Sequence, residues 1–192
     1  MTARREQRLA LLLRGINVGG RKLPMADLRA LLTGLGHTDV KTILASGQAI
    51  VTSDRDPAEV AAELEERLAA DAGLRTEVMV RTGAEMAEIV AASPYPGADG
   101  DGARHAVMFY RGTVTAKQLE RLDPAKYAPD EFVARGREIY LRLPNGFADS
   151  KLSLDVLKLK NPATGRNWNT VRKLEALTAP GAGEEAQRRP IP

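Results

Sequence analysis

Apolar residues recur with two spacings in the first part of the chain, and each spacing predicts a type of element. The run 9–13 is continuously apolar, which is typical of a strand buried on both faces. After Pro24, apolar residues recur at helical spacing as far as Gly36, where a helix is expected to end. Such segments alternate in the order β-α-β-β-α-β. The expected strands are 9–13, 40–45, 49–52 and 76–80, and the expected helices lie at 24–36 and 56–73.

The rest of the chain repeats most of this order after a leading helix that starts near Thr82. Residues 94–104 are rich in Pro, Gly and Asp and are expected to form a surface loop. The expected strands beyond it are 105–110, 131–134, 138–143 and a short one near Ala163, and the expected helices are 115–122, one around 152–159 and one capped by Asn167. The sequence therefore predicts an α+β fold of two tandem ferredoxin-like (βαββαβ) units with antiparallel sheets. The predicted boundaries are 1–82 for the first unit, 83–179 for the second and 180–192 for a disordered tail.

The amino-acid composition excludes several kinds of functional site. The chain has no cysteine, which excludes disulfides, thiolate catalysis and cysteine-ligated metal sites. The acidic residues of segment 59–66 are not joined by a histidine, so no metal is expected, and the cofactor stays unknown. No stretch approaches the ~20 apolar residues that a membrane helix needs. We therefore expect a soluble, cytoplasmic protein with no membrane partner.

Positive charge is concentrated in two segments, although the net charge is only +3. Segment 1–36 has seven basic and two acidic residues, and segment 150–173 has six basic residues and one acid. If the two segments meet in space, they form a surface that attracts anions.

The loop after the first strand is the first candidate site. Its position between a strand and a helix is where a phosphate-binding loop lies. A P-loop, however, has Lys and then Ser or Thr where this chain has Arg21 and Lys22, so a nucleoside-triphosphatase is disfavoured. A smaller anion or a plain turn with solvated basic residues are the alternatives. The candidate residues are Arg14, Asn17, Gly19, Gly20, Arg21 and Lys22.

Two shorter motifs add candidates. Ser46 and Gly47 form either a binding loop or simply a hairpin turn, and neither histidine, His37 or His105, has the spacing of a catalytic triad. The third motif surrounds the only tryptophan of the chain. Asn167 is expected to cap a helix and Trp168 to pack beneath it, and a ligand-binding role is the equal alternative. The candidate residues of this motif are Arg166, Asn167 and Trp168.

These motifs resemble a known family. The segment LLLRGINVGG at 11–20, followed by PMADL at 24–28, ASG at 45–47 and RNWNTV at 166–171, is similar to the bacterial family called domain of unknown function 1697. The chain departs from the family pattern at Gln48, where Asn is usual, and at Gly165, where Thr is common. The resemblance implies a tandem ferredoxin-like fold and implies no activity.

Three functions remain in consideration, in this order. The first is binding of a small anionic or nucleotide-like ligand in a cleft on which all three motifs converge. The second is RNA or DNA binding through the basic segments. This binding is expected to be weak, because Gln48 and Ile50 occupy positions at which an RNA-recognition sheet carries aromatic residues that stack on bases. The third is a protein-interaction scaffold. Whether the protein is an enzyme, and its oligomeric state, stay open.

Overall fold

The chain folds into two compact units. The computed structural model describes residues 6–17, 19–20, 22–43 and 47–182. One unit contains the described residues up to 88 and from 174 onward, and the other contains residues 89–173. We call them the first and the second unit. The predicted tail, 180–192, lies outside the described residues from 183 onward.

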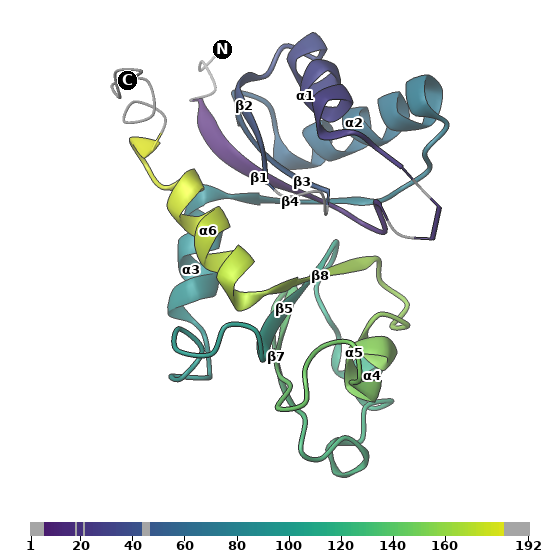
Figure 1. The fold of residues 1–192 in the computed structure, drawn as a ribbon, viewed down its shortest axis with the longest axis vertical. Helices are drawn as coiled ribbons and strands as arrows, with labels where there is room; N and C mark the ends of the chain where they lie inside the picture. The colour runs from purple at the N-terminus through teal and green to yellow at the C-terminus, as the bar shows by residue number, and fades with distance from the viewer. Residues whose placement is uncertain (1–5, 18, 21, 44–46, 183–192) are drawn as a thin grey trace. The chain divides into compact units, whose positions relative to one another are not determined.

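The first unit has the element order predicted from its sequence. Its elements are β1 (Gln7–Leu13), α1 (Met25–Gly34), β2 (Thr38–Ile43), β3 (Gln48–Ser53), α2 (Pro57–Ala72) and β4 (Val78–Thr82), after which α3 (Gly83–Ala91) begins. The four strands form one sheet in the order β2-β3-β1-β4, and every neighbouring pair is antiparallel. Helices α1 and α2 cover one face of this sheet (Figure 1). The core between them is built mostly from leucine and valine side chains.

Strand β1 is buried on both faces, as its continuous apolar run predicts. The side chains from Leu9 to Leu12 are 0% exposed and Leu13 is 1% exposed. A central strand with two covered faces has no need of alternating polar residues. This prediction is confirmed.

Helix α2 begins and ends where the local chemistry predicts. The Asp56 carboxylate accepts a hydrogen bond from Ala58 N at 2.8 Å, and Asp56 N donates to Glu59 at 3.2 Å, which completes a capping box. Gly73 ends the helix with a left-handed conformation. The buried stripe of the helix consists of Val60, Leu64 and Leu68.

The second unit repeats the element order and the strand order of the first. Its elements are β5 (His105–Tyr110), α4 (Ala116–Leu119), the 3-10 turn Pro124–Lys126, β6 (Glu131–Arg135), β7 (Glu138–Arg142), α5 (Lys151–Val156), β8 (Ala163–Asn167) and α6 (Trp168–Thr178), which continues into the first unit. The antiparallel sheet has the order β6-β7-β5-β8. The fold is therefore α+β, with two four-stranded antiparallel sheets and six α-helices in the described residues.

Several predicted elements are shorter or displaced. The strand predicted at 40–45 lies at Thr38–Ile43 in the described residues, and the helix predicted around 152–159 ends at Val156. The helix predicted at 115–122 begins at its expected cap, Thr115, but ends at Leu119, because Asp123-Pro124 starts a separate 3-10 turn. The strand predicted at 76–80 begins instead at Val78, because the two preceding residues contact the loop after β1, as described below. No helix among the described residues combines the length and the apolar character that crossing a membrane requires.

Candidate functional site

The loop after β1 is held between its two neighbouring strands. We call residues 14–23 the β1 loop; residues 18 and 21 lie outside the described part. On one side, Leu13 N donates to Gly47 O at 2.8 Å. On the other side, Arg14 N donates to Glu77 O at 3.0 Å. The first two sequence motifs therefore lie at the same end of the first sheet.

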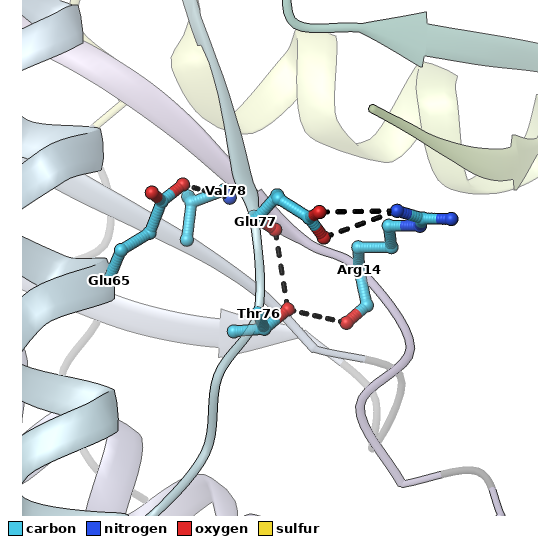
Figure 2. Close-up of polar contacts among 5 residues, drawn as sticks. All are labelled: Arg14, Glu65, Thr76, Glu77 and Val78. Carbon is cyan, nitrogen blue, oxygen red and sulfur yellow. Dashed lines mark hydrogen bonds and ion pairs between the residues drawn. The ribbon is translucent and has the colours of Figure 1, made fainter. Parts of the chain in front are cut away.

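Arg14 and Glu77 form an ion pair at this end of the sheet (Figure 2). Arg14 Nη1 lies 3.3 Å from each carboxylate oxygen of Glu77, and the two side chains are 40% and 39% exposed. The Thr76 hydroxyl donates to the backbone oxygen of Arg14 at 2.6 Å. These contacts couple the start of the β1 loop to the residues before β4.

A pocket opens beside this ion pair. Its volume is about 480 Å³, and its described lining is Arg14, Gly15, Arg75, Thr76 and Glu77. We call it the Arg14 pocket. The described lining residues include two arginines and one glutamate, an excess of one positive charge.

The segment before β4 is also fixed from helix α2. Glu65 accepts a hydrogen bond from Val78 N at 2.6 Å, on the side of the strand away from Arg14 (Figure 2). A carboxylate that accepts from a backbone N–H makes a charge-assisted bond, stronger than a neutral one. The first residue of β4, directly after the pocket lining, is therefore anchored to α2.

Asn17 shapes the β1 loop. Its side-chain oxygen accepts from Leu23 N at 2.9 Å, and its Nδ2 donates to Leu23 O at 3.3 Å. The residue adopts φ +58°, a conformation that asparagine tolerates better than most residues. These two bonds close the loop, so they give Asn17 a structural role there.

The other candidates of the first two motifs differ in their surroundings. A side-chain carbon added at Gly19 or Gly20 would meet nothing within 4 Å, and Lys22 is exposed, so this part of the loop is open to a ligand. At Gly47 the same carbon would lie 2.8 Å from Cβ of Ile16. Close packing therefore requires the glycine. Arg21 and Ser46 lie outside the described residues.

The third motif lies in the second unit and makes mostly internal bonds. Arg166 is 8% exposed and donates to Thr164 Oγ1 and to Gly165 O, both at 2.7 Å. Burial lowers the pKa of Arg166 to about 10. Even so, this side chain stays positively charged at neutral pH.

The two residues after Arg166 have the predicted structural roles. Asn167 accepts from Thr170 N at 2.9 Å, which caps α6, and Trp168 is 4% exposed. The indole Nε1 donates to Asp99 at 2.8 Å, so Trp168 ties the loop before β5 to the start of α6. These structural predictions are confirmed. The convergence of all three motifs on one cleft stays a prediction.

Sequence reasoning missed the segment 75–77. Arg75, Thr76 and Glu77 match no motif, and the sequence predicts a strand that includes the last two, whereas β4 begins at Val78. The available signal was weak, a basic residue two positions after the glycine that ends α2.

The described residues do not favour histidine catalysis, metal binding or the stacking of nucleic-acid bases on the first sheet. His37 and His105 are 4% and 8% exposed, and the latter ring contacts the Asp101 backbone oxygen. No group of three or more His, Asp or Glu side chains in the described ranges is arranged to hold a metal ion. Gln48 and Ile50 are both 0% exposed, so bases cannot stack on the sheet at these positions.

Comparison with known proteins gives a family and a fold. A family model described as "Protein of unknown function (DUF1697)" matches residues 7–140. A solved structure, conserved bacterial protein SP0830 from Streptococcus pneumoniae, is 24% identical with a TM-score of 0.74, and the match covers 91% of this chain and 100% of that one. At this identity the likeness supports the fold alone. No curated protein matched the chain.

Proposed function

Because the chain belongs to the DUF1697 family of proteins of unknown function, we propose a function from its own site: it binds a small anionic or nucleotide-like ligand at the Arg14 pocket. The single observation that carries the proposal is that Arg14 and Arg75, which follow different elements of the first unit, line one pocket.

Arginine is suited to such a site. Its planar guanidinium can bind a carboxylate or a phosphate through two parallel hydrogen bonds. Arg14 is 40% exposed, so a ligand can reach it, and its ion pair with Glu77 holds it in position. Thr76 fixes the backbone of Arg14, which lowers the entropic cost of ordering the site on binding.

The β1 loop offers additional contacts to a larger ligand. Gly19 and Gly20 leave open space beside the backbone, and exposed Lys22 adds a positive charge two residues further along. Backbone amides in such loops can bind a second phosphate group. The proposal is one of binding, because it rests on the two arginines of the described lining.

The experiment is a calorimetric titration of the full chain with phosphate, pyrophosphate, AMP and ATP. The Arg14→Gln variant is expected to bind the preferred anion about tenfold more weakly, the lower range for a charged hydrogen bond at a partly exposed position. Arg67→Gln is the matched control, because Arg67 is 53% exposed and pairs with Asp71 on α2. Equal affinity of the wild type and both variants would contradict the proposal.

We also infer that the chain consists of two ferredoxin-like repeats, the first over 1–82 and the second over 83–179, each of which contains the four-stranded sheet of one unit. The common order of elements and the equivalent strand orders of the two sheets support this inference. This inference rests on topology. If the two repeats share a fold, the backbone positions at the ends of their equivalent strands are also equivalent.

A further inference from the structure

The second unit has basic residues at backbone positions equivalent to those of Arg14 and Arg75. We propose that Arg111 and Lys160 form a second anion site, which takes a small ligand carrying a doubly charged phosphate or a pyrophosphate. This site goes beyond the proposed function because it lies in the other unit and shares no residue with the Arg14 pocket.

The equivalence rests first on register. Arg14 directly follows β1, and Arg111 directly follows β5, the strand in the same place of the second sheet. The last pair of each ladder is Leu13 with Val78 in the first unit and Tyr110 with Ala163 in the second.

The next backbone bond is also the same in the two units. Arg14 N donates to Glu77 O at 3.0 Å, and Arg111 N donates to Pro162 O at 2.9 Å. The two arginines therefore leave their sheets at the same point.

Counting back from the edge strand extends the match. The residue three positions before β4 is Arg75, and the residue three positions before β8 is Lys160. Both are basic and both are exposed. Each unit thus places one arginine after its central strand and one further cation before its edge strand.

A polar side chain joins the two segments in both units. In the first unit it is Thr76, which donates to the backbone of Arg14. In the second unit it is Asn161, at the equivalent position, whose Nδ2 donates to Gly112 O at 2.8 Å and whose oxygen accepts from Gly112 N at 3.1 Å. Gln118 adds a bond to Lys160 O at 3.1 Å. Hydrogen bonds therefore join the segment of Arg111, after β5, to the segment of Lys160, before β8.

The two sites differ in one charge. Pro162 stands where the first unit has Glu77, so the second site has no acid at that position. The five positions equivalent to the described lining of the Arg14 pocket are 111, 112 and 160–162, and they contain two basic residues and no acidic one. Nearby Lys158 pairs with Asp155 at 2.9 Å. Arg111 and Lys160 give the second site two positive charges, against an excess of one in the Arg14 pocket. A more highly charged anion is therefore favoured in the second unit.

The test is a calorimetric titration of the full chain with pyrophosphate at low ionic strength, where exposed charges are least screened. We expect two pyrophosphate ions per wild-type chain. The double variant Arg111→Gln/Lys160→Gln is expected to bind one, and Arg14→Gln is expected to keep the ion bound by the second unit. Lys126→Gln is the matched control, because this second-unit lysine is 70% exposed and lies 3.7 Å from Asp123. Circular dichroism checks that each variant keeps its fold.

The outcomes separate the two sites. If the double variant binds as many ions as the wild type, or if Lys126→Gln weakens binding equally, the second site is overturned. If Arg14→Gln leaves binding unchanged while the double variant abolishes it, the second site stands and the Arg14 pocket fails. A single ion that depends on Arg14 alone would overturn the second site and leave the proposed function intact.

Discussion

Gly47 is the point at which the packing of the β1 loop against the β2–β3 connection should be most sensitive to substitution. Gly47→Ala places a carbon 2.8 Å from Cβ of Ile16 and 3.3 Å from Cβ of Leu13, at a residue with φ +73°. The left-handed conformation costs a residue with a side chain about 1–2 kcal/mol. Overpacking of a buried site costs a further ~1–3 kcal/mol. We therefore expect a loss of about 2–5 kcal/mol in the free energy of unfolding.

Gly73→Ala is the matched control for this prediction. Gly73 lies in the same unit with φ +63°, but an added carbon there meets nothing within 4 Å, so only the conformational cost of about 1–2 kcal/mol applies. Urea unfolding followed by far-ultraviolet circular dichroism compares the two variants. The excess loss in Gly47→Ala measures the steric conflict with Ile16. Equal losses in the two variants would refute the packing argument.

Two further predictions concern buried polar groups. Tyr110→Phe is expected to cost about 1–2 kcal/mol in urea unfolding, because the buried hydroxyl donates to Val156 O at 2.7 Å and its loss leaves that carbonyl unsatisfied; wild-type stability would contradict this. Burial, and secondarily the charge of Arg55, lowers the pKa of His37 below 6.5, so the unfolded chain binds the proton more readily than the folded one. The stability that neutral His37 provides is then complete above about pH 6.5 and is lost as the pH falls through the lowered folded pKa. His37→Gln should reduce this acid sensitivity in urea midpoints measured from about pH 5 to about pH 7.5, and an unchanged pH dependence would contradict the assignment.

The sequence predicts most of the elements because their signals are local. The apolar run of β1, the capping box at Asp56 and the helix cap at Asn167 each depend on residues within a few positions of one another. Such signals need no knowledge of the tertiary fold.

The Arg14 pocket could not be predicted in the same way. Arg14 meets Glu77 across 63 positions of sequence, and only the register between β1 and β4 brings the two together. The motif residues that were predicted, such as Arg166 and Trp168, stand out by type. The partner of Trp168, however, is Asp99, which lies 69 positions away in the sequence and is brought near only by folding.

The hydrogen bond between Trp168 and Asp99 also determines which part of the protein its intrinsic fluorescence monitors. The chain has a single tryptophan, so all of its indole fluorescence comes from the start of α6 in the second unit. The ring is 4% exposed and its N–H is bonded to a carboxylate on the neighbouring loop. The emission is therefore an intrinsic probe of that loop, whereas the described lining of the Arg14 pocket contains no aromatic residue.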